Sequence, residues 1–343
     1  MSIITINEFV MQEQHRVDGA TGELSLVIGD IVSACKKIAL AVNQGALSGT
    51  MGNLESQNIQ GEVQKELDVI ANEIFLKSNL ASGHIAGMAS EEMDEPYEIS
   101  EKSRQFGKYL LLFDPLDGSS NVNLNITVGT IFSVLRCPAG VSNPKLEDYL
   151  QPGTSQVCAG YALYGSSTML VLTTGKGVNG FTLDHVTDDF LLTHPDMRIA
   201  ADTQEFAINM SNQRYWEPSV KRYIEECLQG REGVRQKDFN MRWVGSMVAE
   251  VHRILIRGGV FIYPIDSKLK DKGGRLRLLY EANPMSFIVE QAGGASSTGY
   301  ERIMEVNPNS LHQRVPVILG AHNEVVLLMS YHHQFSNNDL MGN

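Results

Sequence analysis

The sequence has few cysteines and no long apolar run. Its four cysteines are scattered through 343 residues, with no CxxC pair and no zinc-ligand spacing; they are Cys35, Cys137, Cys158 and Cys227. This usage favours core packing in a reducing compartment over a disulfide framework. No apolar run approaches the roughly 18 residues of a membrane helix, and the N-terminus lacks the basic-then-apolar pattern of a signal peptide. We therefore expect a cytoplasmic protein that does not enter membranes.

Positive charge is also scarce. Twenty-eight Lys and Arg residues against forty Asp and Glu residues give a net charge of −12, which argues against nucleic acid as a partner. The length and the 43% hydrophobic content allow a sizeable core in one large α/β unit or in two domains. If so acidic a chain binds an anionic ligand, it must hold its positive charge locally, in metals and a few placed Arg or Lys side chains.

The chain is organised around residues 113–121, which read Phe-Asp-Pro-Leu-Asp-Gly-Ser-Ser-Asn. The preceding apolar run, residues 109–113, predicts a buried strand that Pro115 ends, and Gly118 permits a turn. Two carboxylates therefore follow a strand end, where open α/β sheets bind ligands. The serines after them offer hydroxyls and amides to an anion. Taken alone, the segment is equally compatible with a tight turn and a helix cap.

Other carboxylates follow comparable segments. Glu91 and Glu92 come after a strand-like run at residues 84–88, and Glu281 precedes a short predicted helix and an Ala-Gly-Gly ending. Carboxylates that converge on one strand edge repel one another unless a cation neutralises them. Hard divalent ions such as Mg²⁺ do this with carboxylate and phosphate oxygens as ligands.

These residues carry a resemblance. The acidic segments look like the metal site of the Mg²⁺-dependent, lithium-sensitive sugar phosphatases, and the segments 242–247 and 276–286 narrow the likeness to class I fructose-1,6-bisphosphatases. The likeness extends from about Phe9 to the last predicted helix near 325–331. It implies an α/β sugar phosphatase fold, with two stacked domains of mixed sheets in alternating helix and sheet layers. We place an N-terminal regulatory domain at 1–195 and a sugar-bisphosphate-binding domain at 196–343.

The resemblance also assigns catalytic roles. The implied cofactor is Mg²⁺, two or more ions per subunit, with Mn²⁺ or Zn²⁺ as substitutes. Glu92 and Asp68 match the groups that activate the attacking water, and Asp68 belongs to a loop that closes over the site. Without the resemblance, Asp68 is read as a solvated or capping residue of a helix with Val63, Leu67, Ile70 and Ile74 on its buried side. The matched metal ligands are Glu91, Asp114, the backbone carbonyl of Leu116, Asp117 and Glu281.

Substrate contacts follow from the same match. Arg275 and Arg277 alternate with leucines and share one strand face, which suits a phosphate clamp or, in the plainer reading, a solvated face. Arg242 matches a residue that reaches the neighbouring subunit, which implies a homotetramer with two-fold symmetry. Where the resembling family usually has a tyrosine and a lysine, this sequence has Trp243 and Arg275. These differences change the hydrogen-bond donors of the implied 6-phosphate pocket. The implied substrate residues are Asp117, Gly118, Ser119, Ser120, Asn212, Tyr215, Arg242, Tyr263, Arg275 and Arg277.

An effector site is implied near the N-terminus. Apolar positions at 24, 28, 31, 35, 38 and 42 predict an amphipathic helix, and its start is suited to phosphate. In the resembling family this region binds AMP, an allosteric inhibitor; the plainer reading is a helix start and ordinary solvated charges. Cys137 is the only cysteine in the 137–155 loop, so we do not expect the disulfide regulation of the chloroplast enzymes. The matched AMP positions are Thr21, Gly22, Glu23, Leu24, Ser25, Lys108, Tyr109 and Arg136.

The remaining patterns complete the expected fold. A Gly- and Ser-rich stretch at 43–60 predicts a mobile loop. Strands are expected at 127–136, 157–164, 168–173, 181–184, 190–193 and 261–263, with a domain boundary near Pro195. Helices are expected at 218–228 and, from Val244 onward, up to Gly258.

The implied activity is Mg²⁺-dependent hydrolysis of the 1-phosphate of fructose 1,6-bisphosphate in gluconeogenesis, with AMP as inhibitor. Sedoheptulose-1,7-bisphosphatase activity, alone or in addition, shares this chemistry and serves carbon fixation. Inositol monophosphatases are shorter and lack the bisphosphate residues. A non-catalytic sensor of AMP or sugar phosphates would have lost at least one metal carboxylate, whereas all five acidic positions are present.

Overall fold

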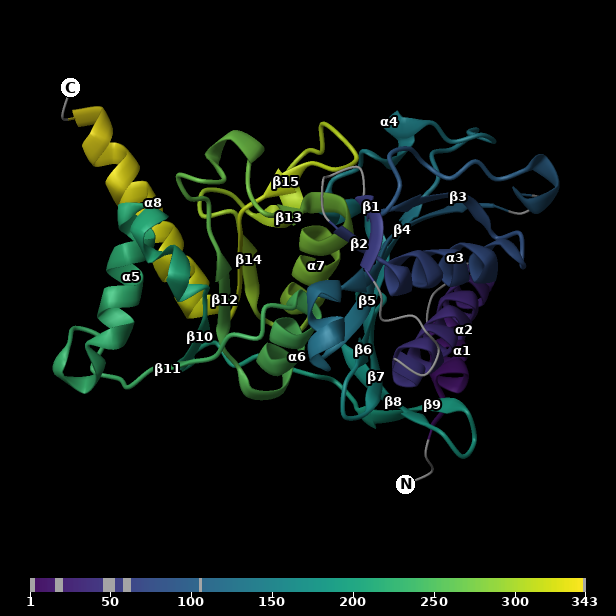
Figure 1. Ribbon diagram of the computed structural model, residues 1–343, viewed down its shortest axis with the longest axis horizontal. Coiled ribbons are helices and arrows are strands. Elements are labelled where there is room, and N and C mark those ends of the chain that lie inside the picture. Colours follow the sequence, from purple (N-terminus) through teal and green to yellow (C-terminus); the bar gives the residue numbers. More distant parts are fainter. Residues whose placement is uncertain (1–3, 16–20, 46–52, 58–62, 105–106, 342–343) are drawn as a thin grey trace.

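The computed structural model describes residues 4–15, 21–45, 53–57, 63–104 and 107–341. Within these residues the chain forms five alternating layers (Figure 1). Helices α1–α3 cover one face of a large sheet, α6 and α7 lie between this sheet and a second one, and α5 and α8 cover the outer face of the second sheet. This arrangement confirms the α/β class and the alternating layers expected from the resemblance.

The large sheet has seven strands in chain order, β3 to β9. Only β3 and β4 are parallel, and each later pair is antiparallel. The parallel pair β3 and β4 forms one edge of the sheet, and the candidate site described below lies at the ends of these two strands. The strands are β3 (Ile85–Ser90), β4 (Tyr109–Asp117), β5 (Val128–Arg136), β6 (Gln156–Tyr164), β7 (Thr168–Thr173), β8 (Asn179–Asp184) and β9 (Asp189–His194).

The second sheet has the order β11-β10-β12-β16-β14 and is also mixed. Two further antiparallel pairs, β1 with β2 and β13 with β15, lie outside both sheets. The remaining strands are β10 (Glu205–Ala207), β11 (Asn240–Met241), β12 (Val260–Tyr263), β14 (Ala295–Ser297), β16 (Val317–Gly320), β1 (Asn53–Gln57), β2 (Val63–Lys65), β13 (Leu276–Arg277) and β15 (Arg314–Val315).

The helices follow local signals in the sequence. Pro218 opens α5, where its missing amide costs nothing, and Gly258, at φ 80°, ends α6 in a conformation that favours glycine. No helix of the described segments is both long and apolar enough to cross a bilayer. The helices are α1 (Ile6–His15), α2 (Glu23–Gln44), α3 (Glu66–Leu80), α4 (Leu146–Tyr149), α5 (Pro218–Leu228), α6 (Met247–Arg257), α7 (Asn283–Gln291) and α8 (His322–Met341).

Most predicted elements are present, and four expectations were wrong in detail. Pro115 does not end the strand, because β4 continues to Asp117 with a register shift after Asp114. Val63 belongs to β2, so α3 begins three residues later. Asp68 lies in α3, not on a loop. Val244 precedes α6, which begins at Met247.

The predicted mobile loop at 43–60 lies largely outside the described residues. The part that is described forms the end of α2 and strand β1.

The β-strand period distributes side chains between two cores. In β6, Cys158 and Ala162 face α1–α3, whereas Tyr161 and Leu163 face α6 and α7. Strand β5 alternates in the same way, so the central strands are apolar on both faces. The large sheet is therefore a buried platform that fixes the strand ends at its edge.

Replacement of Phe132 by alanine tests this platform. The ring is fully buried, and Gly160 lies so close that a Cβ there would be 2.3 Å from the ring. We expect Phe132→Ala to lower the free energy of unfolding by about 3–5 kcal/mol in denaturant titration. Val186→Ala, at a side chain that is 92% exposed, should change it by less than about 0.5 kcal/mol. Similar losses in both variants would contradict the assignment of the core.

Candidate active site

The candidate active site lies where three elements bring carboxylates to one space. In the parallel pair β3 and β4, Ser90 lies opposite Phe113, so the residues that follow, Glu91 and Asp114, emerge side by side. Asp117 ends β4. Glu281 lies in a π-helical turn, η8 (Leu278–Ala282), that leads directly into α7. All four carboxylate side chains are buried.

These carboxylates form a compact cluster. One oxygen from each of Asp114, Asp117 and Glu281 lies within 4.8 Å of the others. Arg277 pairs with Glu91, and its Nη1 lies 3.9 Å from Oε2 of Glu281. One guanidinium leaves most of this negative charge uncompensated, so the cluster favours a further cation or bound protons.

The backbone around Asp117 is shaped for close approach. Its carboxylate accepts hydrogen bonds from the Ser246 hydroxyl at 3.0 Å and from the Val248 amide at 2.9 Å, near the start of α6. Gly118 adopts φ 75°, and a Cβ there would lie 2.8 Å from Cβ of Ser246. Glycine at 118 therefore allows the turn that carries Ser119 to approach α6. The sequence analysis missed Ser246 because only the fold brings α6 to β4.

The pKa values of the cluster reflect its burial. Desolvation raises the pKa of Asp117 to about 7, and the charge of Glu281 adds to the effect. Desolvation, followed by the charges of Glu91, Asp117 and Glu281, raises the pKa of Asp114 well above its usual range. Burial also raises the pKa of Glu281 despite the nearby Arg277. Without a cation the cluster therefore favours bound protons at neutral pH.

The donor set fits a hard divalent cation. It consists of buried carboxylate oxygens, with no His or Cys in the cluster. Arg277 contacts the cluster and the charge of Arg275 also acts on Glu281, so two guanidiniums face four carboxylates. Oxygen-only ligands with a surplus of negative charge suit Mg²⁺ or Mn²⁺ better than the softer ions that prefer nitrogen or sulfur.

A cleft of about 450 Å³ extends from the cluster. One wall is aromatic: the ring of Trp243 stacks on Phe261 with centroids 5.9 Å apart, and Tyr263 lies 5.9 Å from Trp243. Asn209, Phe261 and the segment 244–247 also line the cleft and were not predicted. The predicted residues that line it are Asp68, Glu91, Glu92, Asp114, Leu116, Asp117, Gly118, Ser119, Ser120, Tyr263, Arg275, Arg277 and Glu281.

Three predicted substrate residues do not line this cleft. Asn212 and Tyr215 belong to the 3₁₀ helix η5 (Met210–Tyr215), and the Tyr215 ring contacts Arg214 and Lys268. Arg242 is half-exposed, with Nε 3.6 Å from Oε1 of Glu205.

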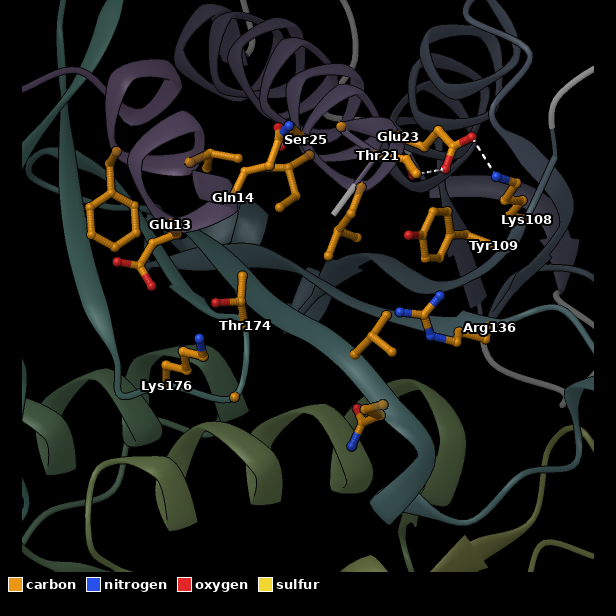
Figure 2. Close-up of a pocket in the computed structure, with 18 of the residues that line it drawn as sticks. Glu13, Gln14, Thr21, Glu23, Ser25, Lys108, Tyr109, Arg136, Thr174 and Lys176 are labelled. Carbon is orange, nitrogen blue, oxygen red and sulfur yellow. Dashed lines mark hydrogen bonds and ion pairs between the residues drawn. The ribbon is translucent and has the colours of Figure 1, made fainter. Parts of the chain in front are cut away.

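A second pocket, of about 540 Å³, lies between helices α1 and α2 and the strands of the large sheet (Figure 2). It gathers all eight predicted effector residues: Thr21, Gly22, Glu23, Leu24, Ser25, Lys108, Tyr109 and Arg136. Gly22 precedes α2 at φ 86°, and within the described segments its helix start has no side-chain cap hydrogen bond. Lys108 is paired with Glu23 at 2.6 Å, so this lysine is not an isolated solvated charge. Lys176 and Thr174, from the loop after β7, face the pocket from the opposite side and were not predicted.

Buried carboxylates that fit divalent cations, beside a Gly-Ser-Ser turn and two arginines, define a metal-dependent phosphate-ester hydrolase. The chain matches family models described as the fructose-1,6-bisphosphatase N-terminal domain over residues 4–195 and C-terminal domain over residues 199–333. It belongs to the class 1 fructose-1,6-bisphosphatase family.

Related proteins are similar to this chain over nearly its whole length. A class 1 fructose-1,6-bisphosphatase of Halorhodospira halophila is 57% identical, with 96% of this chain and 98% of that protein covered. One from Methylibium petroleiphilum is 54% identical, with 96% and 92% covered. The crystal structure of holo Leishmania major fructose-1,6-bisphosphatase has a TM-score of 0.89 at 38% identity, covering 96% and 99% of the two chains. Its apo form has a TM-score of 0.84 at 36% identity, with the same coverage.

The raised pKa of Asp117 predicts how stability depends on pH in the metal-free protein. Because folded Asp117 retains its proton to about pH 7 and the unfolded side chain loses it near pH 4, the native state binds more protons between these values. Stability should therefore fall as the pH rises from 5 to 8. Thermal unfolding in EDTA should show this fall, and Asp117→Asn should reduce it. A metal-free protein that becomes more stable over this range would contradict the prediction.

Proposed function

We propose that the chain removes the 1-phosphate of fructose 1,6-bisphosphate, using Mg²⁺ and giving fructose 6-phosphate and inorganic phosphate in gluconeogenesis. Family membership establishes the activity class, a fructose-1,6-bisphosphatase of carbohydrate metabolism. The observation that carries the assignment to this cleft is the approach of Asp114, Asp117 and Glu281 within 4.8 Å beside the Gly118 turn.

The carboxylates would hold the metal. Glu91, Asp114, Asp117 and Glu281, with the carbonyl of Leu116, are the proposed ligands of two or more ions, for which Mn²⁺ or Zn²⁺ could substitute. When bound, divalent cations neutralise phosphoryl oxygens and supply an activated water. Arg277 pairs with Glu91 and contacts Glu281, so it orients two of the proposed ligands.

The other cleft residues would position the substrate and the water. Glu92 and the buried Asp68 are the proposed acceptors of the water proton. The hydroxyls and amides of Ser119 and Ser120 would bind the 1-phosphate, because the turn at Gly118 directs them into the cleft. Arg275 and Tyr263 also line the cleft, where they would receive the sugar and the 6-phosphate.

A neighbouring subunit would complete the substrate site. Arg242 is half-exposed and follows the exposed edge strand β11, so its guanidinium is available to a second chain. We propose that it reaches the 6-phosphate of a neighbour in a homotetramer, and that Asn212 and Tyr215 form the adjoining rim. Residues 1–195 would then form the regulatory part and residues 196–343 the sugar-binding part. The four free thiols support a reducing compartment such as the cytoplasm.

The second pocket is the proposed AMP site. The uncapped start of α2 supplies backbone amides, and Lys108 and Arg136 supply positive charge. Such an arrangement suits a phosphate, and Tyr109 adds an aromatic surface with a hydroxyl.

Substitution of Asp117 tests the active-site proposal. Asp117→Asn keeps the shape of the side chain but removes a ligand charge, so we expect Mg²⁺-dependent phosphate release to fall at least about a hundredfold. Asp184→Asn, at an exposed carboxylate on β8, should leave the rate unchanged. Near-normal turnover of Asp117→Asn would overturn the site. The same assay with sedoheptulose 1,7-bisphosphate measures sugar preference through the ratio of kcat/KM values.

Inhibition by AMP is tested separately. Phosphate release from fructose 1,6-bisphosphate should fall as AMP rises, and Arg136→Ala should increase the AMP concentration for half inhibition about tenfold or more, because a charge-assisted hydrogen bond contributes about 1.5–3 kcal/mol. Arg231→Ala, which disrupts an exposed ion pair outside the pocket, is the control. A rate of phosphate release that does not change with AMP would contradict the allosteric proposal, whereas the proposed hydrolase activity would stand.

A further inference from the structure

Helix α7 connects the second pocket to the carboxylate cluster. The π-helical turn that carries Glu281 ends at Ala282, and α7 begins at Asn283 without a break. The helix then runs about 14 Å, at 1.5 Å per residue, between the two sheets (Figure 1). A shift of α7 along or about its axis therefore displaces Glu281 with it.

One residue of α7, Phe287, lines the second pocket, and other residues on the same face of the helix contact the segments around it. Asn283, Phe287 and Gln291 are spaced by four, so they share this face. Phe287 lines the pocket, and its ring tip would lie 3.5 Å from a Cβ at Gly175, which also lines it. Gln291 accepts a hydrogen bond from the Gly177 amide at 3.1 Å. The loop after β7 therefore contacts both the middle and the end of the helix.

Gln156 fixes the start of α7. This buried residue of β6 also lines the second pocket. Its Nε2 donates to the Asn283 carbonyl at 3.1 Å and to the Gly153 carbonyl at 2.9 Å, and its Oε1 accepts from the Ser133 hydroxyl at 2.8 Å. The carboxamide thereby ties the large sheet to a residue two positions after Glu281.

We infer that α7 is the element through which occupancy of the second pocket sets the position of Glu281, with Gln156 and Phe287 as its positioning residues. A ligand in the pocket must accommodate Phe287 and Gln156, and rigid packing between two sheets converts a local displacement into a shift of the whole helix. The identity of AMP as this ligand rests on the proposed function. By linkage, the ligand should weaken metal binding by the same factor by which metal weakens ligand binding.

The first experiment measures that factor. Calorimetric titration of the full-length enzyme with Mn²⁺, with and without saturating AMP, should give a ratio of metal dissociation constants of about fivefold or more. Phe287→Ala should reduce this ratio at least threefold. The measurement is made at saturating AMP, so that any weakening of AMP binding by the substitution does not affect the ratio. Phe206→Ala removes a buried ring of β10 that belongs to the core under α5 and α8 and does not line the pocket, and it should retain the wild-type ratio.

A second experiment needs no AMP. Gln156→Leu removes the hydrogen bonds that Nε2 donates to the Asn283 and Gly153 carbonyls and, at 3.6 Å, to Sδ of Met304. We expect the Mn²⁺ dissociation constant to rise at least about fivefold. Ser133→Ala removes only the bond to Oε1, so α7 remains tied and the metal affinity should stay within twofold of the wild type. Equal unfolding midpoints for the two variants would separate positioning from loss of fold.

The outcomes separate the two proposals. An unchanged ratio in Phe287→Ala, or wild-type metal affinity in Gln156→Leu, overturns the role of α7 while hydrolysis and AMP inhibition stand. If AMP inhibits the wild-type enzyme but leaves its Mn²⁺ dissociation constant unchanged, the role of α7 is also overturned, because inhibition then follows another route. Absence of AMP binding ends only the AMP proposal, and the Gln156 and Ser133 variants still decide whether the helix positions Glu281.

Discussion

Repulsion among buried carboxylates is the constraint on which this structure depends. Asp114, Asp117 and Glu281 lie within 4.8 Å of one another in a region from which water is largely excluded, and each has a raised pKa. A chain can hold such a cluster only if the surrounding scaffold cannot relax. Here the scaffold is a seven-stranded sheet buried on both faces, together with Arg277, which binds one carboxylate and lies near another. The same repulsion that costs folding free energy in the absence of metal gives a divalent cation its affinity.

The sequence predicted the carboxylates because each lies next to a strong local signal. Asp114 and Asp117 follow an unbroken apolar run, and Glu91 follows another, so strand ends could be located without knowledge of the fold. The failures have identifiable structural causes. Pro115 lacks an amide donor, but the shift in register between Asp114 and Asp117 accommodates it, so β4 continues. Helix α3 begins after Val63 because that residue pairs with Gln57 in a short ladder, a non-local contact that no periodicity reveals.

The sequence could not predict which residues from distant segments contact these carboxylates or line the two pockets. Ser246 and the amide of Val248 bind Asp117 from more than a hundred residues away. The segment 242–247 carries part of the family likeness, but nothing in it marks the Ser246 hydroxyl as a partner of Asp117. The aromatic wall of Trp243, Phe261 and Tyr263 combines two elements in the same way. In the second pocket, Lys176 and Phe287 come from segments that carry no phosphate-binding pattern. Tertiary contacts between short, ordinary segments supply these residues, so only topology can identify them.

The layered architecture explains why two pockets at opposite ends of strand β4 can influence each other. A sheet transmits little motion along its ladder, because each strand is held by hydrogen bonds on both sides. A helix between two sheets is different: it is held mainly by side-chain packing and can shift as a rigid body. Helix α7 occupies that position, starts at the turn that carries Glu281 and presents Phe287 to the second pocket. The carboxylate cluster magnifies any such shift, because the energy of closely spaced charges in a dry environment changes steeply with distance. A site built on repulsion is thus sensitive to small movements of its ligands, and the one ligand that lies on a helix is the one that can move.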